Sequence, residues 1–202
     1  MKDEDYDKRL NIETGEDGKE LHISWHYNRY EPTPYRALET LFSQYQLKRS
    51  DRIVDFGCGK GRLNFFIHDR FQSSVVGIEV DEMLYLEAKE NQKSYVPRTK
   101  NGKENILFLC CKAEEYQMND LDNQFYFFNP FSIQVFRRVI QRILRSVETH
   151  PRKVELVLYY PTKDYVYFLE NDTSFEIVKE VTIPELYEEN QNERFLIFRL
   201  NY

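Results

Sequence analysis

Seven short runs of apolar residues follow one another along the chain from residue 52 to residue 200. Each run holds five to eight residues and is rich in β-branched and aromatic side chains, a pattern typical of buried strands. We therefore expect strands at residues 52–56, 74–80, 105–111, 124–129, 153–160, 174–181 and 193–200.

Segments with helical spacing separate most of these runs. Asp81 and Thr162 are suitable N-cap residues, and Thr33 precedes a proline that we expect at the first helical position, Pro34. No helix is expected between the last two strands. The apolar residues recur three and four positions apart in segments 35–45, 62–70, 82–88 and 135–147, and a shorter helix should follow Thr162.

This alternation predicts an α/β fold with an open sheet that is parallel except near its end. No repeat or linker divides the chain, so we expect a single domain over 21–202, made of an N-terminal lid segment and helix at 21–50 and a core at 51–202. Residues 1–20 contain eight acidic side chains and little that is apolar. We expect them to form a flexible acidic tail.

Composition narrows the possible functions. The 202 residues carry a net charge of −6, which does not favour general binding to nucleic acid. Three cysteines form no disulfide framework, no spacing suggests a metal site, and neither a signal peptide nor an apolar run long enough to cross a membrane is apparent. We expect a cytoplasmic protein without a metal.

A glycine-rich loop joins the first strand to the following helix. Gly57, Gly59 and Gly61 alternate in the sequence GCGKG, where glycine allows close approach of a ligand and the helix start can hold an anion. Glu79 ends the second strand, where a carboxylate can accept both hydroxyl groups of a ribose. The loop and the carboxylate together indicate a cofactor that contains a nucleoside.

The spacing of the glycines and Asp55 point to the type of cofactor. A dinucleotide fingerprint has the spacing G-x-G-x-x-G, whereas this loop reads G-x-G-x-G. An acidic group beside the loop suits a ligand with an ammonium group better than a pyrophosphate. S-adenosylmethionine carries a carboxylate, an ammonium, a ribose and an adenine, and is therefore the cofactor we expect.

The segments VDFGCGKGR, VVGIEVD and FYFFNPF, in this order, resemble class I S-adenosylmethionine-dependent methyltransferases, and within them a bacterial subgroup with GCGKGR and NPF motifs. The resemblance covers about residues 52–202. It implies an open, doubly wound, Rossmann-like sheet of seven strands, mostly parallel, with one antiparallel strand near the C-terminal edge.

The resemblance also implies roles for single residues. Lys112 stands where related enzymes often have an aspartate that binds the adenine, so Ala113 and Glu114 are our candidates for that contact. Cys58, a small filler within the loop, is also a candidate for cofactor binding. The remaining cofactor-binding residues that the resemblance implies are Asp55, Gly57, Gly59, Gly61, Glu79, Val80 and Asn129.

The sequence Asn129-Pro130-Phe131 follows the fourth strand, next to the expected methyl group, and these three residues are our candidates for the catalytic site. Oxygen atoms of the asparagine and of the backbone could accept hydrogen bonds from an amino group, and the ring could hold a flat substrate. The segment resembles the Asn-Pro-Pro-Tyr or Phe motif of enzymes that methylate planar amines, but its ring comes one residue early. We expect transfer to nitrogen, with the acceptor a protein, a nucleic acid or a small molecule.

Residues ahead of the first strand are candidates for a lid over the substrate. In the sequence RYEPTPY these are Tyr30, Thr33 and Tyr35, although tyrosines at such positions are as often part of the core. Two alternative functions stay open. One is a nicotinamide-dependent oxidoreductase, and the other is a protein that binds S-adenosylmethionine without catalysis.

Overall fold

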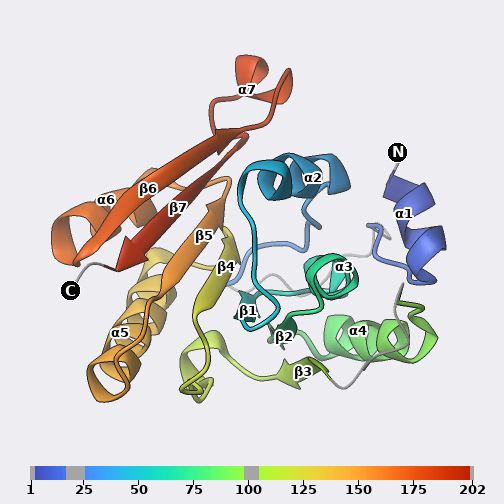
Figure 1. The fold of residues 1–202 in the computed structure, drawn as a ribbon, viewed down its shortest axis with the longest axis horizontal. Helices are drawn as coiled ribbons and strands as arrows, with labels where there is room; N and C mark the ends of the chain where they lie inside the picture. The colour runs from blue at the N-terminus through green and yellow to red at the C-terminus, as the bar shows by residue number, and fades with distance from the viewer. Residues whose placement is uncertain (1–2, 17–25, 98–104, 201–202) are drawn as a thin grey trace.

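A seven-stranded sheet forms the centre of the protein (Figure 1). The structure is a computed structural model, and it describes residues 3–16, 26–97 and 105–200. In these ranges the elements are, in chain order, α1 (Asp3–Leu10), α2 (Tyr35–Gln44), β1 (Arg52–Phe56), α3 (Arg62–Phe71), β2 (Ser74–Glu79), α4 (Glu82–Ser94), β3 (Ile106–Cys110), the 3-10 helix η2 (Ala113–Glu115), β4 (Gln124–Phe128), α5 (Ile133–Thr149), β5 (Glu155–Tyr159), α6 (Lys163–Asp172), β6 (Phe175–Thr182), α7 (Leu186–Glu189) and β7 (Arg194–Leu200).

The strand order is β3-β2-β1-β4-β5-β7-β6. The first five strands of this order are parallel, and β7 pairs antiparallel with both β5 and β6. This confirms the expected doubly wound, Rossmann-like sheet with one antiparallel strand near its edge. The order reverses between β1 and β4, and ligands of such sheets bind outside the carboxyl ends of the strands at that point.

Helices cover both faces of the sheet (Figure 1). One core contains buried residues of α1, α2, α3 and α4 against one face, and a second core contains those of α5 and α6 against the other. Helix α5 shows why the sequence pattern was informative, because its buried residues recur three and four positions apart. The N-caps at Asp81 and Thr162 are confirmed, since each side chain accepts a hydrogen bond from a backbone N–H of the first turn.

The prediction of a flexible tail is wrong for residues 3–16. These residues form α1 and a turn that pack against the core, with Tyr6 and Leu10 buried. The ring of Tyr6 stacks on that of Tyr35, with centroids 4.4 Å apart. Charged side chains of this segment also have buried partners, because the carboxylate of Asp3 lies 2.6 Å from the guanidinium of Arg62. Residues 17–20 of the predicted tail lie outside the described residues.

Two local predictions also need correction. Pro34 is the N-cap of α2 rather than its first residue, and Thr33 makes no cap; its hydroxyl instead bonds to that of Tyr126. A short helix, α7, lies between the last two strands, where no helix was expected. Among the described residues, none of the helices combines the length and apolar character needed to cross a bilayer. Nor does a metal-binding group of three or more His, Cys, Asp or Glu side chains occur in this part of the chain.

Candidate functional site

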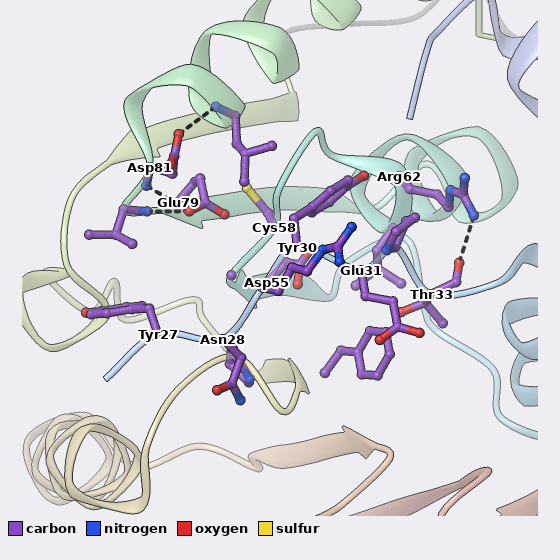
Figure 2. Close-up of a pocket in the computed structure, with 18 of the residues that line it drawn as sticks. Tyr27, Asn28, Tyr30, Glu31, Thr33, Asp55, Cys58, Arg62, Glu79 and Asp81 are labelled. Carbon is purple, nitrogen blue, oxygen red and sulfur yellow. Dashed lines mark hydrogen bonds between the residues drawn. The ribbon is translucent and has the colours of Figure 1, made fainter. Parts of the chain in front are cut away.

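A pocket opens at the carboxyl ends of β1, β2 and β4, where the strand order reverses (Figure 2). Its floor includes Asp55 and Tyr126 of the central strands, and its wall includes the loops that follow β1 and β2. The segment at 27–33 closes the pocket from the other side. The pocket therefore brings together residues from the glycine loop, the end of β2, the end of β4 and the expected lid.

The glycine loop adopts a conformation that other residues rarely accept. Gly57 and Gly59 have φ angles of +80° and +53°. A Cβ atom on Gly57 would lie 2.6 Å from Cβ of Pro130, and one on Gly59 would lie 2.0 Å from a ring carbon of Tyr30. The loop is thus held between the turn after β4 and the lid segment, and only glycine fits at these two positions.

Glu79 fixes the shape of this loop. Its Oε2 atom accepts a hydrogen bond of 2.8 Å from the backbone N–H of Gly59, and its Oε1 atom accepts bonds from the N–H groups of Val80 and Asp81. Burial raises the pKa of the Glu79 carboxyl, and these three backbone hydrogen bonds oppose that effect. The side chain is 6% exposed and lines the pocket, so it joins the loop after β1 to the loop after β2.

Asp55 is a buried carboxyl in the floor of the pocket. Its carboxyl is 4% exposed and has no hydrogen-bond partner among the described residues. Burial raises the pKa of Asp55 well above its ordinary value, and the charge of the nearby Glu79 raises it further. A buried carboxyl facing a cavity without a partner is costly unless a ligand supplies a donor or a positive charge.

The lid segment is tied down at both ends. The side chain of Asn28 donates a 2.7 Å hydrogen bond to the carbonyl oxygen of Asn129, and its backbone N–H donates to that of Pro130. Further along, the hydroxyl of Tyr30 donates a 2.8 Å hydrogen bond to the carbonyl oxygen of Thr14. The segment that follows α1 therefore holds the ring of Tyr30 across the glycine loop (Figure 2).

Many of the predicted site residues lie together in this pocket. Those that line it share positions at strand ends or in the lid, and they are Asp55, Gly57, Cys58, Glu79, Val80, Pro130, Tyr30 and Thr33. Gly59 and Gly61 belong to the same loop, and both have positive φ angles. The pocket also contains residues that the sequence did not single out, among them Glu31, Arg62 and Phe128. Glu31 comes here because the lid segment crosses the strand ends, and the sequence pattern does not reveal the path of that segment.

Other predicted residues lie outside the pocket. Phe131 is 2% exposed, and its ring packs edge-on against Phe127 in the core, so it does not face a substrate as we had expected. Tyr35 is fully buried and donates a 2.6 Å hydrogen bond to Asp7 instead of lining the lid. Asn129 has a φ angle of +41° and is not part of the lining.

The two candidates for the adenine contact also lie outside the lining. Ala113 is buried beneath the sheet edge in the second core. The carboxylate of Glu114 accepts a 3.0 Å hydrogen bond from the hydroxyl of Tyr27, which itself lines the pocket, and pairs with Arg138. Glu114 therefore supports the lid through Tyr27.

Comparison with known proteins finds a family model that matches the segment with the glycine loop. Residues 34–127 match the methyltransferase domain family. The match spans the segment from α2 to β4 and includes the glycine loop, Asp55 and Glu79. It ends before Asn129, so the motif after β4 lies outside it.

A curated relative supports the methyltransferase match over a shorter stretch. The ribosomal protein L11 methyltransferase of Thermotoga neapolitana is 40% identical over 67 residues, which are 33% of this chain and 25% of that protein. The chain thus spans about a quarter of the length of the curated relatives it matches.

Solved structures share the fold at low sequence identity. An S-adenosylmethionine-dependent methyltransferase of Methanosarcina mazei has a TM-score of 0.59 and 16% identity, with 76% of this chain and 93% of that chain covered. Phosphoethanolamine N-methyltransferase 1 of Haemonchus contortus, in complex with phosphoethanolamine and S-adenosylhomocysteine, has a TM-score of 0.59 and 13% identity over 81% of this chain and 42% of that one. These likenesses show a Rossmann-like fold.

Proposed function

We propose that this chain is an S-adenosylmethionine-dependent methyltransferase. The observation that carries the proposal is the buried, unpartnered carboxyl of Asp55 beside the glycine loop. A pyrophosphate would place negative charge beside this carboxyl and raise the free-energy cost of burying it. A ligand with an ammonium group would lower it, and the methyltransferase match over residues 34–127 points to the same cofactor.

The residues present fit such a cofactor. Asp55 would receive the ammonium group, and the glycine loop would lie against the methionine part of the molecule. Glu79 already accepts three hydrogen bonds, but its two carboxylate oxygens offer about four lone-pair sites, so it can still accept one from a ribose hydroxyl. Val80, 37% exposed at the pocket wall, offers an apolar surface for the adenine.

When bound, this cofactor would supply an activated methyl group on a positively charged sulfur. The enzyme then has mainly to align the acceptor with that methyl group and to exclude water. Tyr30 and Thr33 close the pocket over the cofactor, and Pro130 limits the space beside Gly57. The pocket needs no nucleophilic side chain for this chemistry, and Cys58 does not supply one, because burial raises the pKa of its thiol well above the ordinary value.

We further propose that the acceptor atom is nitrogen. The lone pair of an amine would accept the methyl group that the cofactor supplies, the electron pair of the carbon–sulfur bond would stay on sulfur, and the positive charge would pass to nitrogen. An ammonium substrate releases one proton to water in the overall reaction. The carboxylate of Glu31 in the pocket would stabilise the charge that develops on nitrogen. An oxygen acceptor that reacts as its anion would lose negative charge in the transfer and would gain nothing from this carboxylate.

The motif after β4 gives less support to a planar amine than we expected. The carbonyl oxygens of Asn129 and Pro130 both accept hydrogen bonds from Asn28, and that of Phe131 accepts one from the hydroxyl of Tyr165. Nitrogen as the acceptor atom therefore rests on the carboxylate of Glu31 rather than on this motif.

Binding of S-adenosylhomocysteine, followed by calorimetry, tests the proposal against both alternatives. We expect S-adenosylmethionine and S-adenosylhomocysteine to bind and to raise the melting temperature, because a ligand selective for the folded state must do so. We expect NAD to do neither. Binding of NAD alone would favour the oxidoreductase. Cofactor binding without transfer of a radiolabelled methyl group to any fraction of a cell extract would favour a binding protein without catalysis.

A further inference from the structure

The pocket has a second half that the cofactor residues do not use. Asp55, the glycine loop and Glu79 lie over β1 and β2, whereas Phe128 is the last residue of β4 and lines the pocket on the side of β5. A ligand bound on the first side would leave the surface over β4 and β5 to a second molecule.

Aromatic rings continue this surface from Phe128 onto the end of β5. The ring centroid of Phe128 lies 4.6 Å from that of Tyr159 and 6.4 Å from that of Tyr160. Phe128 and Tyr160 are only partly buried. Tyr160 has a φ angle of +50°, which bulky side chains rarely adopt. Its hydroxyl accepts a 2.6 Å hydrogen bond from Asn190, and its backbone N–H donates to the carbonyl of Arg194.

Two carboxylates accompany these rings. The hydroxyl of Tyr159 donates a 2.5 Å hydrogen bond to Glu193, which precedes β7, and Glu31 of the lid lines the pocket. Burial raises the pKa of Tyr159, and the charges of Glu193 and Glu31 raise it further, so both carboxylates lie near this ring. We call Glu31, Phe128, Tyr160 and Glu193 the acceptor face, and the ring of Tyr159, only 1% exposed, lies beneath it.

The negative charge of the acceptor face is poorly balanced. Partial burial raises the pKa of Glu31, and the charges of Glu16 and Glu193 raise it further, with Arg29 opposing them. Arg29 itself lies 3.8 Å from Glu16. A positively charged ligand would relieve this repulsion, and the exposed faces of the rings attract the same kind of ligand through cation–π interactions.

We propose that the acceptor face binds an alkylammonium group, with Glu31 as its counter-ion and Phe128 and Tyr160 as its aromatic walls. The identification of this group as the methyl acceptor rests on the proposed function, whereas the binding itself does not. The substrate class is then an aliphatic amine, and its methylated product is a better cation–π ligand than the amine it came from, because its charge is less strongly hydrated.

Binding of choline and of its uncharged counterpart 3,3-dimethyl-1-butanol, followed by ligand-observed NMR, tests this inference. The two probes have nearly the same shape and differ in charge. We expect choline to bind at least about 10-fold more tightly than the alcohol, which corresponds to about 1.4 kcal/mol. Glu31→Gln should weaken choline binding about 5-fold and leave the alcohol unchanged. Glu170→Gln, which removes the same charge from the exposed face of α6, is the matched control and should change neither.

Phe128→Leu should also weaken choline binding, and Tyr160→Leu replaces it if the first variant fails to fold. Equal affinity for choline and the alcohol, or unchanged choline binding in Glu31→Gln, would overturn the inference. Binding of S-adenosylhomocysteine to the same samples separates the two proposals. If S-adenosylhomocysteine does not bind while choline does, the proposed function is wrong and the ammonium site stands. If S-adenosylhomocysteine binds and choline does not, only the cofactor site stands.

Discussion

The ring of Tyr30 lies across Gly59, with its Cε2 atom 2.0 Å from the position that a Cβ atom would take on residue 59. Gly59→Ala must therefore displace this ring, and it also places a side chain at a φ angle of +53°. We expect the substitution to lower the free energy of unfolding by about 1–3 kcal/mol, measured by urea denaturation.

A double-mutant cycle separates the two causes. In the Tyr30→Ala background the ring is absent. Gly59→Ala should therefore lower the free energy of unfolding by at least about 1 kcal/mol less there than in the wild-type background. Strictly additive effects would mean that the ring and the loop are not in contact.

Glu79 stabilises the loop as well as the cofactor we propose. Glu79→Ala leaves the backbone N–H groups of Gly59, Val80 and Asp81 without their acceptor, so it should lower both the affinity for S-adenosylhomocysteine and the melting temperature. Each lost bond to this charged group is worth about 1.5–3 kcal/mol at most, and water recovers part of that loss. Glu79→Gln keeps an acceptor oxygen, so its affinity and its melting temperature should lie between those of the wild type and of Glu79→Ala. Calorimetry on all three proteins measures both effects, and an unchanged melting temperature in Glu79→Ala would contradict the role of Glu79 in stabilising the loop.

Asp55 should make cofactor binding depend on pH. Its pKa is raised, by burial first and then by Glu79, so the carboxyl stays protonated to a higher pH than usual and is then unable to pair with an ammonium group. The affinity for S-adenosylhomocysteine should therefore rise with pH as Asp55 loses its proton, and this rise should lie at a higher pH than the ordinary range of an aspartic acid. Asp55→Asn should bind weakly and lose this dependence. An identical pH profile in the two proteins would assign the effect to another group.

Phe131 is a core residue in the structure, and its substitution should affect folding first. Phe131→Ala removes a buried ring that contacts Phe127 and Tyr27, at an expected cost of about 3–5 kcal/mol in unfolding free energy. Phe131→Leu fills most of the space and should retain methyl transfer once an acceptor is known. A stable Phe131→Leu protein with intact cofactor binding and no transfer would restore this residue to the catalytic site.

Glu155 should contribute to stability in an acid-sensitive way. Burial alone would raise the pKa of its carboxyl, but hydrogen bonds from Tyr45, Lys153 and Arg199 outweigh burial and lower it to about 2. A lowered pKa in the folded state gives stability that is present above the ordinary value near 4.5 and is lost as the pH falls toward 2. Denaturation of wild type and Glu155→Gln between pH 2 and 7 checks this, and the difference between them should shrink as the pH falls.

The fold followed from the sequence because its signals are local. Apolar runs of strand length, the periodicity of α5 and the caps at Asp81 and Thr162 depend on neighbouring residues only. The packing of α1 did not follow, because two buried side chains, Tyr6 and Leu10, had to be recognised among many charges. The partners of this segment, such as Tyr35 for Tyr6 and Arg62 for Asp3, are far away in sequence.

The candidate site was predictable where it depends on strand ends. The loops after β1 and β2 must meet if their strands are neighbours, so Asp55, Gly57 and Glu79 come together. The position of Phe131 was not predictable, because the left-handed backbone of Asn129 redirects the chain directly after β4. Glu31 and Phe128 were missed because their roles depend on how the lid segment crosses the sheet.

The contacts of residues 3–16 bear on where this protein can be shortened. The methyltransferase match begins at residue 34, which invites expression of the chain from that point. Such a cut would remove Asp3 and Thr14, which bind the guanidinium of Arg62 at 2.6 and 2.8 Å, and would leave that buried charge without them. It would also remove Tyr30 itself. The packed structure that includes the pocket and its lid therefore begins about 30 residues before the segment that matches the methyltransferase family model.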